Sequence, residues 1–210
     1  ALCRELHLAG LRLILDGVFN HVGAGHRWFN RRRVFAEPGA WQDRSSPFAE
    51  FFYFQRHPDR CECWQGVKEL VKLDYRCRRL REEIYAGHQS VVRRWLRPPY
   101  AIDGWRLDVA NMLGRCGRVQ LGDEVLRELR AAVKETNPGA YLLGENFFDP
   151  TGQLQGDQVD GVQAYHAFHY PVLRWLTGRE PQLPKGLRRQ PEVHGAAAGA
   201  EALAGALIEA

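Results

Sequence analysis

Short apolar runs recur along the chain, and each of the three strongest ends close to an acidic side chain. These runs cover residues 11–16, 102–109 and 141–146, and a weaker one covers 161–165. None contains proline, and each is rich in apolar or aromatic side chains, which is typical of short buried strands. The pattern therefore predicts strands at these four places.

Between these runs the apolar positions follow a helical spacing. Residues 123–136 place their apolar side chains on one face and are followed by Asn137-Pro-Gly, which predicts a helix and its end. A second helix is expected over 78–96, with an interruption at Gly87 and a stop at Pro98-Pro99. Two further stretches are expected to be helical: residues 2–9 and 196–210.

Strands that alternate with helices predict a parallel sheet and thus an α/β fold. Acids at successive strand ends favour a (β/α)8 barrel over an open sheet, because barrel enzymes gather their functional groups at that end. Residues 22–75 are irregular, rich in aromatic residues and broken by prolines, and a connection this long is usually a lid or small subdomain. We therefore expect a barrel segment over 1–21, a lid over 22–75 and a second barrel segment over 76–210.

The composition narrows the function classes. The chain has 210 residues, enough for one domain with a hydrophobic core, and its net charge of +4 is too weak to indicate nucleic-acid binding. No apolar run approaches the length of a membrane span, so no membrane partner is expected. The five cysteines are odd in number and lack a regular framework, which favours reduced thiols and a cytoplasmic location.

The strand over 102–109 carries two charged residues, Arg106 and Asp108. Because a strand has a period of two, both side chains should lie on the same face and pair with each other. The pairing would keep the carboxylate ionised, as a catalytic nucleophile requires. A purely structural ion pair is an equally good interpretation of this strand taken alone.

The next strong strand ends in Glu145, and neighbouring parallel strands lie about 5 Å apart. Its carboxyl group is then expected about 5 Å from that of Asp108, the separation used for retaining glycoside hydrolysis through a covalent intermediate. Leu142, Leu143 and Phe147 surround Glu145 in sequence. An apolar setting favours the protonated form and suits a general acid/base.

Three short motifs now identify a family. Residues 16–21 (Asp-Gly-Val-Phe-Asn-His), 104–111 (Gly-Trp-Arg-Leu-Asp-Val-Ala-Asn) and 144–146 (Gly-Glu-Asn) resemble, in order, three regions that define the α-amylase family of glycoside hydrolases. Residues 70–74 (Leu-Val-Lys-Leu-Asp) resemble a further region in the lid of that family and indicate the neopullulanase and maltodextrin glucosidase branch, although Val71 stands in place of the usual proline. The resemblance implies a partial (β/α)8 barrel, about strands three to six, with the lid after the third strand.

The resemblance also implies roles for the catalytic residues. Asp108 would be the nucleophile, Glu145 the general acid/base, and Arg106 the group that orients the nucleophile. The reaction implied is retaining hydrolysis of α-glucosidic bonds in maltodextrin-like α-glucans. The partner is therefore an α-glucan oligosaccharide, and the full-length parent is expected to be able to form a homodimer.

Substrate-binding residues follow from the same motifs. Asp16 and His21 would line the subsite for the glucose on the non-reducing side, and Lys72 and Asp74 of the lid motif are further candidates. Asn20 is implied as a structural support, or as a calcium ligand in those members that bind calcium. No cofactor is required for this chemistry.

Two rival functions stay open from the sequence. A catalytically silent glucan-binding or scaffolding relative could keep the fold, although it has no chemical need of the costly Arg106, Asp108 and Glu145. A metal-dependent hydrolase could use Asp16, His21 and His26, but the spacing of these histidines does not match a helical ligand pair.

The chain is also expected to be a fragment. Compared with the family that it resembles, the chain is expected to lack the first two β/α units and the region with a histidine and a third acid. Because a partial barrel has exposed sheet edges, these 210 residues alone are expected to fold poorly or associate and to hydrolyse little. Circular dichroism with size-exclusion chromatography would test this: a monomer that melts cooperatively would contradict it.

Overall fold

A parallel four-stranded sheet forms the centre of the computed structural model, which describes residues 2–179. The strands are β1 (Ile14–Gly17), β6 (Gly104–Leu107), β9 (Tyr141–Gly144) and β10 (Gly161–Val162). They lie side by side in chain order, and each neighbouring pair is parallel. The predicted α/β class with a parallel sheet is confirmed. The helix expected over 196–210 lies outside the described residues.

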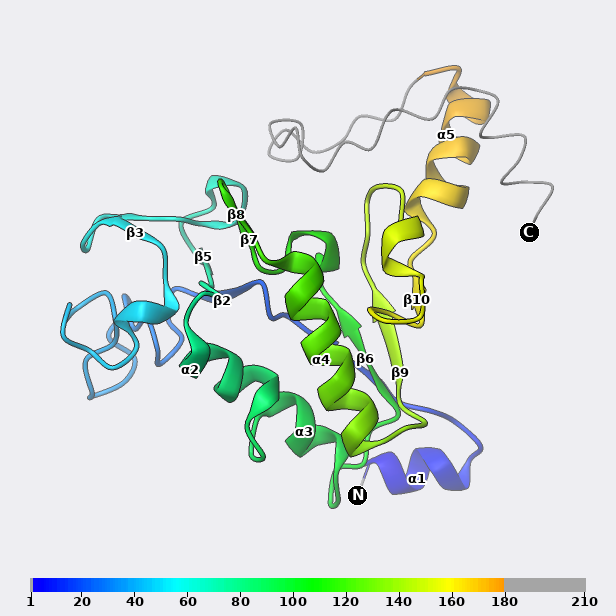
Figure 1. The fold of residues 1–210 in the computed structure, drawn as a ribbon, viewed down its shortest axis with the longest axis horizontal. Coiled ribbons are helices and arrows are strands. Elements are labelled where there is room, and N and C mark those ends of the chain that lie inside the picture. The colour runs from blue at the N-terminus through cyan, green and yellow to red at the C-terminus, as the bar shows by residue number, and fades with distance from the viewer. Residues whose placement is uncertain (1, 180–210) are drawn as a thin grey trace.

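Helices cover one face of this sheet (Figure 1). Trp105, Leu107 and Leu142 point to that face, are at most 3% exposed, and belong to the same core cluster as Val125 and Leu129. Within residues 2–179, no helix is both long and apolar enough to cross a membrane. The α-helices are α1 (Leu2–Leu8), α2 (Arg78–Arg81), α3 (Val91–Leu96), α4 (Gly122–Thr136) and α5 (Tyr170–Thr177), and two π-helical turns cover Glu82–Ala86 and Tyr165–His169.

The other face of the sheet is open among the described residues. Asp16, Arg106, Leu143 and Gly161 are register neighbours across the four strands. Lateral neighbours in a sheet share a face, so this row points away from the helices. One row earlier on the same face, Ile14 is 39% exposed, which shows that solvent reaches this side. The polar side chains of the strands therefore gather on the open face.

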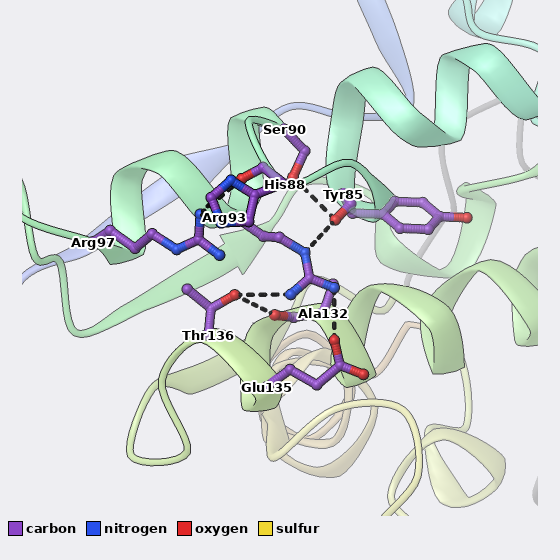
Figure 2. A network of polar contacts seen from close by, with 8 residues as sticks. All are labelled: Tyr85, His88, Ser90, Arg93, Arg97, Ala132, Glu135 and Thr136. Atoms are coloured by element: carbon purple, nitrogen blue, oxygen red, sulfur yellow. Dashed lines mark hydrogen bonds and ion pairs between the residues drawn. The ribbon is translucent and has the colours of Figure 1, made fainter.

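The helix expected over 78–96 forms in two pieces. The α2 helix continues into a π-helical turn, stops at Gly87 as expected, and resumes as α3 after Ser90. The side chains of Ser90 and Arg93 both donate hydrogen bonds to the Tyr85 carbonyl oxygen, at 3.0 and 3.1 Å. Arg93 also bonds to two residues of α4, Glu135 and Thr136, so this network locks the interrupted helix onto α4 (Figure 2).

Residues 22–75 contain little regular structure, as expected. The longest-range pairing joins β2 (His21–Gly23) to β5 (Leu70–Lys72) and places His21 opposite Lys72. The segment thus returns to the carboxyl end of β1. Most of its aromatic side chains pack in the core cluster or against it, as expected, and its role as a lid stays a prediction. Two further hairpins are β3 (Phe54–Arg56) with β4 (Arg60–Cys61), and β7 (Arg115–Cys116) with β8 (Val119–Gln120).

An acid at the amino end of two strands clamps each strand to its neighbour. Asp103 precedes β6, and its carboxylate accepts the Leu13 N–H at 2.8 Å and contacts His7 and Arg12. Asp160 precedes β10 and likewise accepts the Leu142 N–H at 2.8 Å, with two basic side chains of α4 as partners. Both clamps fix the strand register at the end of the sheet opposite the predicted site.

Replacing Asp103 by asparagine is expected to cost about 1–2 kcal/mol of unfolding free energy, because hydrogen bonds to the charged carboxylate are lost. Burial opposes ionisation here, but the Leu13 N–H and the His7 and Arg12 contacts outweigh it and lower the pKa of Asp103 to about 2. Its contribution is therefore present above the ordinary pKa of 3.8 and is lost as the pH falls through about 2. The melting temperature of the variant should therefore change less with pH across this range than that of the wild type. The exposed Arg127–Asp157 pair gives the control, since Asp157→Asn should change little.

Candidate active site

The carboxyl ends of three neighbouring strands bring their acids to one arginine. The Arg106 Nη1 atom lies 2.7 Å from Asp16 Oδ1 and 2.9 Å from Asp108 Oδ1, and its Nη2 atom lies 2.8 Å from Glu145 Oε2. Asp16 lies in β1 and Arg106 in β6. Asp108 follows the end of β6, and Glu145 comes directly after β9. The structure thus gathers the three predicted catalytic residues and Asp16 at one place.

The Arg106 guanidinium is the electrostatic centre of this group. Burial works against its charge, but hydrogen bonds to Asp16 and Asp108 and the field of Glu145 raise its pKa. The side chains of Arg106 and Asp108 are 22% and 21% exposed, so the pair is half-buried. The pair lies at the carboxyl ends of the strands, which is where ligands bind to parallel sheets.

Glu145 is only 7% exposed, and its Oε2 atom accepts the Val109 N–H at 2.9 Å. Val109 has a φ of +40°, in the left-handed region that a β-branched residue rarely adopts. The chain turns there, so the strand expected to reach Val109 ends at Leu107. Phe147 does pack nearby, but the ion pair with Arg106 corrects the expectation of a purely apolar setting for this carboxylate.

His21 lies beside this group and is buried. Its ring stacks on Trp64 with centroids 6.2 Å apart and an interplanar angle of 6°. Burial lowers the pKa of His21, the charge of Asp108 acts in the opposite direction, and Lys72 lowers it further. The imidazole is therefore neutral at neutral pH and can exchange hydrogen bonds with hydroxyl groups.

The two lid-motif candidates are engaged by the chain itself. Lys72 is 5% exposed, and its Nζ atom donates to Asn20 Oδ1 at 2.5 Å and to the Met112 carbonyl oxygen at 3.1 Å. Burial lowers the pKa of Lys72 to about 8. The Asp74 carboxylate is held by the Arg76 guanidinium at 2.6 Å. Substrate contact by Lys72 and Asp74 stays a prediction.

The surroundings of Asn20 do not fit a calcium ion. Its side-chain oxygen already accepts a hydrogen bond from the Lys72 ammonium, whose positive charge opposes a second cation. Within residues 2–179, no three or more His, Cys, Asp or Glu side chains gather in a way that could hold a metal ion. Asp16, His21 and His26 are the candidate ligands of a metal-dependent hydrolase. Asp16 is paired with Arg106, while the His26 ring packs on Trp28.

Replacing Asn20 by alanine is therefore expected to destabilise the fold equally with calcium and with EDTA, by about 1–3 kcal/mol, because a buried ammonium loses a partner. Chemical denaturation in the two buffers would measure this. A loss seen only in calcium would show that Asn20 holds the ion.

Three contributions to the site were missed in the sequence. The Val109 backbone N–H binds Glu145, Trp64 stacks on His21, and Gln163 accepts a hydrogen bond from Arg106 Nε at 3.2 Å. Only Gln163 carried a usable signal: it lies two residues beyond Gly161, and so on the same face of the sheet as Arg106.

Comparison with known proteins decides the family. The model of the α-amylase catalytic domain matches residues 1–177. The chain belongs to the α-amylase family. Neopullulanase 2 of Thermoactinomyces vulgaris is 32% identical over 183 residues, which cover 84% of this chain and 28% of that protein. The amylopullulanase of Thermoanaerobacterium saccharolyticum is 28% identical over 194 residues, which cover 85% of this chain and 14% of that protein.

Solved structures are similar to this chain as well. The cyclic α-maltosyl-(1→6)-maltose hydrolase of Arthrobacter globiformis, in its ligand-free form, has a TM-score of 0.65 and 28% identity, covering 82% of this chain and 36% of that one. Relatives named neopullulanase, cyclomaltodextrinase and intracellular maltogenic amylase confirm the expected branch. The chain spans about a third or less of the length of these relatives.

Proposed function

We propose that the protein containing this chain hydrolyses α-glucosidic bonds in maltodextrin-like α-glucans with retention of configuration. The observation that supports this most is the bridging of Asp108 and Glu145, at the ends of adjacent strands, by the single guanidinium of Arg106. In this proposal the chain supplies about strands three to six of a (β/α)8 barrel, and residues 22–75 form the lid over its mouth.

In the first step a carboxylate oxygen of Asp108 attacks the anomeric carbon, and the bond to the leaving oxygen breaks. Glu145 gives its proton to that oxygen. In the second step Glu145 takes a proton from water, the resulting hydroxide attacks the anomeric carbon, and the bond to Asp108 breaks. Both residues end in their starting states, so the cycle balances without a cofactor.

Arg106 and Glu145 must part before the first step, because Glu145 has to carry a proton. An incoming glucan displaces water from around Glu145, which is only 7% exposed, and brings the leaving oxygen that receives the Glu145 proton. Arg106 then keeps Asp16 and Asp108 as its partners. His21 and Asp16 hold hydroxyl groups of the sugar, and the Trp64 ring keeps His21 in place.

The substrate class rests on relatives whose names refer to pullulan, cyclomaltodextrin and maltose products. We also propose a cytoplasmic location, because one relative is named intracellular and the five cysteines are free. Assembly as a homodimer of the whole protein completes the proposal.

Mechanism-based labelling tests this function. The full gene product would be incubated with maltotriose to measure hydrolysis and with a 2-fluoro glucosyl fluoride to trap the intermediate, and the labelled peptide would be sequenced by mass spectrometry. Label on Asp108 is expected. Hydrolysis without label on Asp108 would overturn the mechanism, and glucan binding without hydrolysis or label would establish the silent binding relative instead.

A further inference from the structure

One nitrogen of Arg106 is held by a neutral side chain. Carboxylates occupy both terminal nitrogens, while the Nε atom donates to Gln163 Oε1 at 3.2 Å. We propose that Gln163 is a positioning residue, which fixes the plane of the Arg106 guanidinium and thereby the alignment of Asp108 and Glu145. This inference rests on the proposed function.

The backbone places Gln163 level with the two catalytic acids. The Asp108 N–H donates to the Gly17 carbonyl oxygen at 3.2 Å, and the Glu145 N–H donates to that of Leu107 at 2.9 Å. The Gln163 N–H repeats this bond on the next strand, to the Gly144 oxygen at 2.9 Å. Asp108, Glu145 and Gln163 are therefore equivalent positions on three neighbouring strands.

Both backbone polar groups of Gln163, its N–H and its carbonyl oxygen, are hydrogen-bonded. Its own carbonyl oxygen accepts the Tyr165 N–H at 2.8 Å, so the chain turns tightly just beyond it. The Tyr165 hydroxyl then lies 3.4 Å from Glu145 Oε1. A single turn thus brings one side chain to Arg106 and a second side chain to the general acid/base.

A carboxamide suits this position for an electrostatic reason. Arg106 already compensates three carboxylates, and a fourth negative charge beside Glu145 would favour the protonated form of every acid in the group. The Gln163 oxygen accepts a hydrogen bond without adding charge. Since a guanidinium is planar and rigid, holding its Nε atom also sets where both terminal nitrogens point.

Two substitutions separate orientation from charge. Gln163→Met has a similar volume but offers the Nε–H only a weak thioether acceptor, and it is expected to lower kcat on maltotriose about 10-fold with KM changed less than about 2-fold. Gln163→Glu restores the acceptor and should recover most of kcat, while its charge moves the basic limb of the pH–rate profile upward by about one pH unit. Gln155→Met, at an exposed position away from the site, is the matched control and should leave both constants unchanged.

A second readout does not need activity. NMR spectra of protein labelled with 15N-arginine would show the Nε–H signals of the arginines. The signal of Arg106 is identified as the one that disappears in Arg106→Lys. Gln163→Met should speed its exchange with solvent at least about 10-fold, because the hydrogen bond that protects it is gone.

The outcomes are distinct. Suppose that the wild-type protein is active and that Gln163→Met changes neither kcat, the pH profile nor the exchange rate. This result would overturn the positioning role of Gln163 and leave the proposed function intact. Wild-type protein that neither hydrolyses maltotriose nor takes the label overturns the proposed function, and the positioning role falls with it. If Gln163→Met and Gln163→Glu lower kcat equally and the pH profile does not shift, the positioning role is also overturned. Gln163 would then act through its packing alone.

Discussion

Asp108→Asn is expected to lower kcat of the full gene product on maltotriose by at least about 10⁴-fold, because an amide cannot form the glycosyl ester that carries the reaction. KM should change little, since the amide oxygen can still accept the hydrogen bond from Arg106 that the carboxylate accepts at 2.9 Å. The fold should be kept for the same reason, with a melting temperature within about 2 °C of the wild type. Steady-state kinetics and calorimetry on the same preparation would measure both effects.

Azide provides the control for this variant. A small external nucleophile can attack the anomeric carbon in place of the lost carboxylate only if the acid/base and the binding residues are intact. Azide should therefore restore part of the activity and give a β-glucosyl azide. Asp157→Asn, at an exposed ion pair, should hydrolyse maltotriose at the wild-type rate. A loss of less than about 10-fold in Asp108→Asn would mean that another group is the nucleophile.

Arg106→Lys is expected to have the second-largest effect, a loss of kcat of about 10²–10³-fold. An ammonium is a point charge and cannot reproduce the fork that binds Asp108 through one nitrogen and Glu145 through another. Incompletely paired carboxylates should also lower the unfolding free energy by about 1–3 kcal/mol. Kinetics and urea denaturation would measure the two losses separately.

Arg130→Lys is the matched control for that substitution. The Arg130 side chain is 20% exposed, against 22% for Arg106, but among residues 2–179 its one ion-pair partner is Asp160, which Lys134 also holds. Its replacement should cost less than about 1 kcal/mol and leave kcat unchanged. Wild-type kinetics in Arg106→Lys would show that charge alone, and not the fork, matters at this position.

The sequence sufficed for the sheet and for the first layer of the site. Acids that follow apolar runs placed Asp108 and Glu145 at neighbouring strand ends, and the period of two placed Arg106 beside Asp108. Asp16 joined them because parallel strands end at the same edge of a sheet. These inferences depend on local periodicity, which is why they could be made without coordinates.

Other features of the site depend on contacts between distant segments, which no local pattern encodes. The hydrogen bond from Lys72 to Asn20 joins residues that are 52 positions apart, so their contact could not be expected from the residues around either one. The left-handed backbone of Val109 is hidden for a different reason, since β-branched residues favour extended conformations. The half-burial of Arg106 likewise depends on which face of the sheet the helices cover.

The two acid clamps have a consequence for how this protein can change. Asp103 and Asp160 lock the register at one end of their strands, whereas Asp108, Glu145 and Gln163 occupy the other end. Residues at the second end can therefore be exchanged while strand alignment is preserved by the first. Substrate specificity can in this way vary at the carboxyl ends of the strands, while the two clamps keep β1 aligned with β6 and β9 with β10.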